Sequence, residues 1–255
     1  MGRIGDKTEE LAGIMDRLLS PAGCPWDREQ THQSLSRYLI EECYEAVEAI
    51  KSGDMQQLRE ELGDVLLQVV FHAALAQREG QFDLSQVAEA VSQKMINRHP
   101  HVFSDLSLHT SGEVLEIWEG FKKGEGKKTV LEGIPMMLPA LLRAFKIQEK
   151  ASRAGFDWPE VEGALDKFKE EVEELGRAES SQELTEEMGD VFFALVNVAR
   201  MKDIEPEEAL QASNDKFLRR FNYIEAEAGR RGQDLKDMSL EEMDLLWEEA
   251  KKQGL

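Results

Sequence analysis

Two copies of one acidic helix-pair pattern constrain the fold of this chain more than any other feature. The first copy runs through residues 39–50 and 58–67, and the second through residues 165–175 and 184–193. In each copy, apolar residues recur at helical spacing on both sides of a short break. The first break is at Gly53, a residue that commonly ends helices, and the second is the polar run 178–182. The sequence therefore predicts two antiparallel helix pairs, each carrying EExxE on its first helix and ExxD on its second.

Acidic residues equidistant from the turn of such a pair are expected to lie side by side. The pairs obtained are Glu45 with Glu61 and Glu42 with Asp64 in the first copy, and Glu174 with Glu187 and Glu171 with Asp190 in the second. Like charges this close repel one another, so each cluster needs a cation, protons or a wide separation. All-oxygen ligands suit Mg²⁺, with Mn²⁺ as the alternative. A single acidic helix is ordinarily a solvated face, but the repetition favours two metal sites.

Composition and charge limit the class of protein further. The chain has 255 residues, of which 41% are hydrophobic and 32% charged, and aliphatic and charged helix formers dominate it. These features predict an all-α protein. The net charge of −20 argues against a nucleic acid polymer as partner, because such binding depends on Lys and Arg neutralising phosphates. The sequence shows no P-loop and no zinc-binding spacing.

The repeat predicts two domains, residues 1–126 and 127–255, joined at the glycine-rich segment 124–129. Each is expected to be a bundle of four to five helices. Helices outside the acidic pairs are expected at 8–19, 84–97, 111–123, 138–154, 206–229 and 239–253. No segment is apolar enough for a signal peptide or a membrane span, which favours a cytoplasmic protein without membrane contact. Cys24 is expected in a loop and Cys43 on the buried stripe of its helix, both as reduced thiols.

Basic and aromatic residues repeat along with the acids. The two copies have the same order of i, i+4 pairs: Lys94 and Arg98, then Trp118 and Lys122, in the first half, and Lys216 and Arg220, then Trp247 and Lys251, in the second. One such pair is ordinary helix surface. As a repeated set beside carboxylates, the cations suit phosphate groups and a tryptophan face suits a nucleobase. The set therefore favours a phosphate-ester site.

The chain resembles the MazG family of the all-α nucleotide pyrophosphohydrolase superfamily over essentially its full length. The acidic motifs are typical of the superfamily. The segments Cys24-Pro25-Trp26-Asp27 and Arg98-His99-Pro100-His101-Val102-Phe103 are typical of MazG, and Gly155-Phe156-Asp157-Trp158 also matches.

The resemblance implies Mg²⁺-dependent hydrolysis of nucleoside triphosphates, ribo and deoxy alike, to the monophosphate and pyrophosphate, by a homodimer. It also implies roles for residues, with the C-terminal half as the main catalytic one. The metal ligands there would be Glu171, Glu174, Glu187 and Asp190, with Lys167, Lys216, Arg220, Trp247 and Lys251 binding substrate. The N-terminal counterparts would be Glu42, Glu45, Glu61 and Asp64 for metal, with Lys94, Arg98, Trp118 and Lys122 for substrate.

Under this hypothesis a metal-activated water attacks the phosphorus next to the nucleoside, and Glu171 or its neighbour Glu170 orients that water. Three alternatives stay open from the sequence. One is a narrower enzyme that cleaves only dUTP or a phosphoribosylated nucleotide. Another is a non-catalytic helical module that docks a protein partner through its acidic surface. The third, a di-iron bundle, is disfavoured because the second helix of each pair carries Asp64 or Asp190 where that fold requires histidine.

Overall fold

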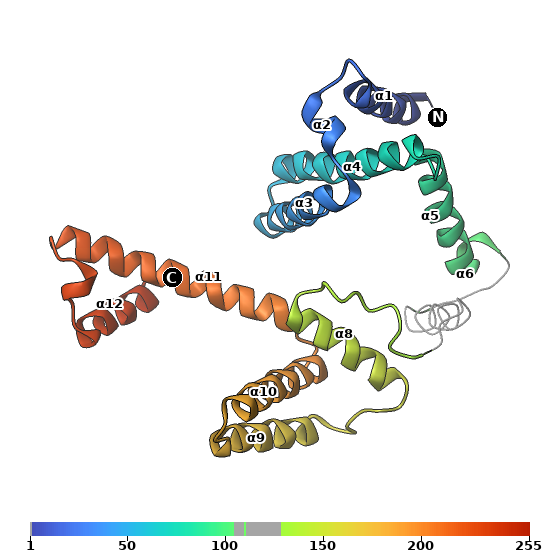
Figure 1. Ribbon diagram of the computed structural model, residues 1–255. Coiled ribbons are helices and arrows are strands. Elements are labelled where there is room, and N and C mark those ends of the chain that lie inside the picture. The colour runs from blue at the N-terminus through green and yellow to red at the C-terminus, as the bar shows by residue number, and fades with distance from the viewer. Residues whose placement is uncertain (1, 105–109, 111–128) are drawn as a thin grey trace. The chain divides into compact units, whose positions relative to one another are not determined.

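The computed structural model describes residues 2–104, 110 and 129–255 (Figure 1). This part of the chain is helical and contains no strand, which confirms the all-α prediction. Its helices are α1 (Gly2–Leu19), α2 (Pro25–Glu29), α3 (His32–Ser52), α4 (Met55–Arg78), α5 (Leu84–Arg98), α6 (Pro100–Phe103), α8 (Ala140–Arg153), α9 (Val161–Arg177), α10 (Ser181–Met201), α11 (Pro206–Arg230), the 3₁₀ helix η1 (Leu235–Asp237) and α12 (Leu240–Lys252). The predicted helix over 111–123, including Trp118 and Lys122, lies outside the described residues.

The chain divides into two units, Met1–Phe121 and Lys122–Leu255. Each unit contains one of the predicted acidic helix pairs, α3 with α4 and α9 with α10. The expected boundary between residues 126 and 127 lies outside the described part of the chain, so its position stays a prediction.

Local signals fix the ends of the first helix pair. Thr31 caps α3, accepting a hydrogen bond from the Ser34 backbone N–H, while the Ser34 side chain accepts one from the Thr31 N–H. Gly53 ends the helix with a φ of 73°, in the left-handed region that glycine tolerates best. Asp54 then caps α4 through the backbone N–H groups of Gln56 and Gln57. The predicted stop at Gly53 is confirmed, and the tight turn makes α3 and α4 antiparallel neighbours.

The core of the first unit lies where α1 and α3 pack against the second half of α4. Its buried residues are Met15, Leu19, Leu35, Val70, Phe71, Ala74 and Leu75. The first half of α4, which carries Glu61 and Asp64, extends beyond this core. The half of α4 that carries the acids is therefore more solvated than its other half, where all of its buried residues lie.

The second unit repeats the hairpin and adds further helices. Ser180 caps α10 in a reciprocal arrangement with Glu183, and α9 and α10 pack as an antiparallel pair. The buried Gln148 on α8 donates its side-chain N–H to the Phe193 carbonyl on α10. Helix α12 folds back on the C-terminal part of α11 around a separate apolar cluster of Ile224, Ala228, Met238 and Leu246. The unit thus contains an acidic hairpin and an α11–α12 pair (Figure 1).

Several sequence-based expectations need correction. The first helix begins at Gly2, six residues earlier than predicted. The sequence also predicts a loop over residues 20–27 and a polar turn over residues 98–103, and the structure has a short helix that begins with proline in each, α2 and α6. Cys43 is exposed, not buried. The apolar stripe that contains Cys43 is covered only in part, because Ala46 is buried whereas Val47 and Ile50 are 42% and 60% exposed. Periodicity identifies the apolar face correctly but does not say whether this chain alone covers it.

Within the described ranges, no helix combines the length and apolar character needed to cross a membrane.

Candidate active site

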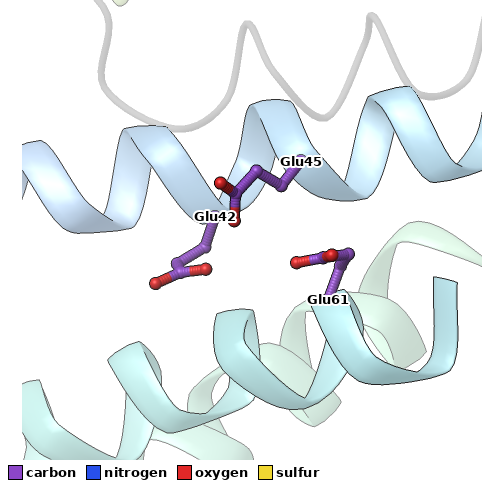
Figure 2. A group of neighbouring side chains, drawn as sticks. All are labelled: Glu42, Glu45 and Glu61. Atoms are coloured by element: carbon purple, nitrogen blue, oxygen red, sulfur yellow. The ribbon is translucent and has the colours of Figure 1, made fainter. Parts of the chain in front are cut away.

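The first acidic hairpin brings three predicted ligands together. Glu42 and Glu45 lie on α3 and Glu61 on α4, and one carboxylate oxygen from each lies within 4.8 Å of the other two. Figure 2 shows the three side chains extending from the two helices into the space between them. Glu42 and Glu61 are half-buried and Glu45 is exposed. Asp64, the fourth predicted ligand, is exposed and is not one of the three, although its charge acts on Glu42.

The second hairpin builds a similar group from a different selection of the predicted residues. Glu171 on α9 and Glu187 and Asp190 on α10 offer oxygens within 4.8 Å of one another. Glu171 is 7% exposed, whereas Glu187 is half-buried and Asp190 exposed. Glu174 is not one of these three, but it lies close enough for its charge to act on Glu187. Three of the four predicted ligands therefore converge in each half.

The carboxylates within each group perturb one another. Burial, followed by the negative charges of Asp64 and Glu45, raises the pKa of Glu42 above its ordinary value. Burial, followed by the charges of Glu174 and Glu171, raises the pKa of Glu187 in the same direction. Both groups hold more negative charge than their surroundings favour, which is the arrangement a cation stabilises.

The donor sets fit a hard divalent cation. Magnesium takes oxygen ligands at about 2.0–2.1 Å in octahedral geometry, which places ligand oxygens about 3–4 Å apart. The carboxylate oxygens of each group already lie within 4.8 Å of one another, so small side-chain rotations would bring them to these separations. The open side of each group leaves room for water and substrate oxygens, because one ligand in each is exposed.

A lysine is paired with the second group. The Lys167 ammonium lies 2.8 Å from Oε1 of Glu171 and 3.0 Å from Oε1 of Glu170. The hydrogen bonds to Glu171 and then to Glu170 hold the pKa of Lys167 well above its usual range. Two of the predicted C-terminal site residues besides the metal ligands, Lys167 and Glu170, are thus in contact with that group. The first group has no such partner: among the described residues, no ion pair involves Glu42, Glu45 or Glu61.

Two of the predicted substrate-binding residues of the second half, Arg220 and Trp247, form a cation–aromatic cluster between α11 and α12. The Arg220 guanidinium lies over the Trp247 ring, 5.3 Å from its centroid, and its Nε donates to the Leu255 carbonyl. Phe217 lies 5.3 Å from Trp247 between ring centroids. Lys216 is exposed, and Lys251 pairs with Glu248 at 2.7 Å. Sequence reasoning missed Phe217, whose only signal was its place within the Lys216–Arg220 pair.

Within the described residues, the carboxylates of the second hairpin and this cation–aromatic cluster are separate. In the part of the second unit that is described, no hydrogen bond or ion pair links Lys216, Arg220 or Lys251 to the carboxylates of the hairpin. In the first unit, Lys94 is exposed and Arg98 half-buried on α5, which packs against α4. Trp118 and Lys122 lie outside the described residues.

A further ion pair, which sequence reasoning missed, joins the loop before α9 to the end of α10, at the end of the second hairpin opposite its turn. Arg200, at the end of α10, binds both carboxylate oxygens of Asp157 in the loop before α9, and it also contacts Asn197. The neighbouring Trp158 packs on Gly163, where an added Cβ would lie 2.7 Å from the ring. The Gly155–Trp158 motif therefore anchors the first turn of the helix that carries Glu171. Only Asp157 was visible in the motif, because Arg200 lies 43 residues away.

Comparison with known proteins agrees with this geometry. The family model described as "MazG nucleotide pyrophosphohydrolase domain" matches twice, over residues 30–103 and 159–224, and each match contains one acidic hairpin. The chain is 45% identical over 254 residues to "Nucleoside triphosphate pyrophosphohydrolase/pyrophosphatase MazG" of Thermotoga maritima, covering 98% of both chains. It is 44% identical over 261 residues to "Nucleoside triphosphate pyrophosphohydrolase" of Escherichia coli K12, covering 98% of this chain and 99% of that one. The helical fold, the two acidic hairpins and the two matches together place this chain in the MazG nucleotide pyrophosphohydrolase family, as a tandem repeat of its domain.

Proposed function

We propose that the protein is a nucleoside triphosphate pyrophosphohydrolase that requires Mg²⁺ and accepts both ribo- and deoxyribonucleotides. The observation that carries this proposal is the pair of three-carboxylate groups on antiparallel helices, placed where the family model matches. Both close full-length relatives cited above are named as enzymes of this activity. The reaction adds one water across the bond between the α- and β-phosphates, giving a monophosphate and pyrophosphate.

In the C-terminal half, Glu171, Glu187 and Asp190 would hold the metal, with Glu174 in reach as a further ligand. Bound there, Mg²⁺ would lower the pKa of a coordinated water and neutralise phosphate oxygens. Glu170, exposed beside the group, or Glu171 would accept the proton of the attacking water. The N-terminal group of Glu42, Glu45 and Glu61, with Asp64 nearby, would hold metal in the same way.

Cations of the α11–α12 pair supply the second requirement, a positive environment for the leaving pyrophosphate. Lys216 and Arg220 would bind its oxygens, with Lys167 and Lys251 contributing from α9 and α12. The Trp247 ring would stack on the base. Lys94 and Arg98, together with Trp118 and Lys122, are the corresponding candidates of the first half.

A homodimer is part of this proposal. Each unit leaves large apolar side chains uncovered on its acidic hairpin, which is unusual for a surface that faces only water. The exposed apolar side chains are Tyr44, Val47, Ile50, Leu62 and Leu66 on the first hairpin and Val172, Met188, Phe192, Phe193 and Leu195 on the second. A second copy would cover these faces and could bring its own cation–aromatic cluster to the carboxylates. A cytoplasmic location also belongs to the proposal, because nucleotide pools are cytoplasmic and Cys24 and Cys43 are free thiols.

The test is product analysis by anion-exchange chromatography after incubation with ATP, GTP and dUTP, with Mg²⁺, with Mn²⁺ and with EDTA. We expect monophosphate and pyrophosphate from all three nucleotides, and no product in EDTA. Cleavage of dUTP alone would replace the proposal with a narrow enzyme. No turnover, together with no calorimetric binding of Mg²⁺ or nucleotide, would favour a docking module.

Matched variants in the two halves assign the catalytic hairpin. Asp190→Asn is expected to abolish most activity if the C-terminal group is the catalytic one, and Asp64→Asn is its counterpart in the first half. Loss with Asp64→Asn alone would move the catalytic site to the first half. Unchanged Mg²⁺-dependent turnover in the double variant would refute Asp190 and Asp64 as metal ligands.

The dimer has its own test. Light scattering coupled to size exclusion gives the mass, and mixing Asp190→Asn protein with Lys216→Met protein tests whether one copy completes the site of the other. Recovery of activity in the mixture supports a shared site. A monomeric mass would remove the dimer from the proposal while leaving the metal site untouched.

A further inference from the structure

We propose that Lys167 is the resident counter-ion of the C-terminal carboxylate group, and that a divalent cation must displace its ammonium from Glu171 to bind. This inference rests on the proposed metal site and adds a determinant of its affinity. In the family resemblance Lys167 is a substrate-binding residue. Among the residues that the structure describes, its ammonium contacts only carboxylates of its own helix, those of Glu170 and Glu171.

Geometry carries the first step. Glu171 is the most buried of the three carboxylates that converge, and the Lys167 ammonium lies 2.8 Å from its Oε1. Glu171 is also one of the three residues whose oxygens approach within 4.8 Å. A cation bound among those oxygens would therefore lie within a few ångströms of the ammonium. Two positive charges at that separation repel, so the ammonium must move away or weaken binding.

The first half provides the comparison. Glu42 corresponds to Glu171 in the repeat, and the position four residues before it holds Tyr38 in place of lysine. The Tyr38 ring packs against the apolar core, and its hydroxyl accepts a hydrogen bond from Arg37. No ammonium is paired with Glu42 in the described part of this unit. Each group thus consists of three carboxylates, but only the second has a lysine ammonium paired with one of them.

Burial explains why only the second group needs such a partner. A buried carboxylate without a counter-charge is unfavourable, and Glu171 is buried whereas Glu42 is only half-buried. The i, i+4 spacing on α9 places Lys167 directly over Glu171. The ammonium therefore stabilises the metal-free hairpin and at the same time competes with the metal.

The experiment measures Mn²⁺ binding without nucleotide, so it does not depend on turnover. Full-length protein carrying Glu42→Gln and Glu61→Gln leaves the C-terminal group as the metal site, and the electron paramagnetic resonance signal of free Mn²⁺ reports the unbound fraction. We expect Lys167→Met to bind Mn²⁺ about tenfold more tightly than its parent, the equivalent of about 1.4 kcal/mol.

Lys169→Met is the matched control. Lys169 lies on the same helix and pairs with Asp166 at 2.9 Å, so its removal changes the net charge equally without touching Glu171. We expect its Mn²⁺ affinity to stay within about twofold of the parent. Lys167→Arg, which retains a positive charge, is expected to resemble the parent, and Lys167→Gln replaces Lys167→Met should that variant not fold.

Two results would overturn the inference in distinguishable ways. If the parent binds Mn²⁺ and Lys167→Met binds it equally or more weakly than Lys169→Met does, Lys167 is not a competitor and the metal site stands. If the parent binds no Mn²⁺, the metal site of the proposed function fails, and the inference fails with it.

Discussion

The Asp157–Arg200 ion pair gives a quantitative test of how the second hairpin is held together. Two parallel hydrogen bonds join the guanidinium to the carboxylate, and the side chains are only 12% and 30% exposed. A hydrogen bond to a charged group contributes about 1.5–3 kcal/mol. Ordering the long arginine side chain costs about 1–2 kcal/mol, and the partial exposure of Asp157 weakens the attraction. The pair is therefore expected to stabilise the hairpin by about 2 kcal/mol.

The measurement is a double-mutant cycle with Asp157→Ala, Arg200→Met and the combination. Hydrogen exchange read by mass spectrometry, in peptides from the start of α9 and the end of α10, gives the free energy of local opening in each protein. The coupling energy should be about 2 kcal/mol. The same cycle on Lys169 and Asp166, an exposed pair on α9, should show no measurable coupling. A coupling energy below about 0.5 kcal/mol at Asp157–Arg200 would show that the pair does not hold the hairpin end.

Three further predictions concern stability. The pKa of His72 is lowered by burial and then by His32, whose Nδ1 lies 2.7 Å from the Nδ1 of His72. The folded protein therefore loses stability as the pH falls below the ordinary histidine pKa of 6.5, because the unfolded chain takes up the proton first. Thermal unfolding of wild type should show this loss below pH 6.5, and His72→Gln should reduce it. Leu246 is 0% exposed between α11 and α12, so Leu246→Ala leaves a cavity and should destabilise that helix pair by about 3 kcal/mol in urea unfolding. An equal loss for Leu245→Ala, at an exposed position, would show that lost core packing is not the cause. Thr31→Ala removes the cap of α3 and should cost about 1 kcal/mol, with Thr31→Ser close to wild type; an equal loss in both would exclude the hydroxyl as the cause.

Much of the candidate site was predictable because its spacing is local. Glu42 and Glu45 share a helix face by their three-residue spacing, and the short turn at Gly53 and Asp54 returns α4 beside α3. The same reasoning placed Glu171 opposite Asp190, and the structure brings both into one group with Glu187. Arithmetic on residue numbers succeeds here because a tight turn leaves the two helices little freedom to slide.

Residue spacing does not show which carboxylates come close enough to bind one ion, or how buried each of them is. The sequence offered four equivalent carboxylates in each half, and the structure selects a different three in each, omitting Asp64 in one and Glu174 in the other. It also buries Glu171 while leaving the corresponding Glu42 half-exposed. These differences depend on side-chain direction and on neighbouring helices, neither of which a repeat in the sequence records.

The sequence by itself determined the all-α class, the tandem acidic hairpins and the residues from which each site is built, because helix period, caps and turns are properties of a few neighbouring residues. Only the tertiary structure decided that Lys167 neutralises Glu171 and that Arg200 binds Asp157 from 43 residues away. It also decided that Cys43 and Ile50, on the predicted apolar stripe, are exposed. Such contacts depend on how finished helices pack, and packing joins residues with no fixed relation along the chain.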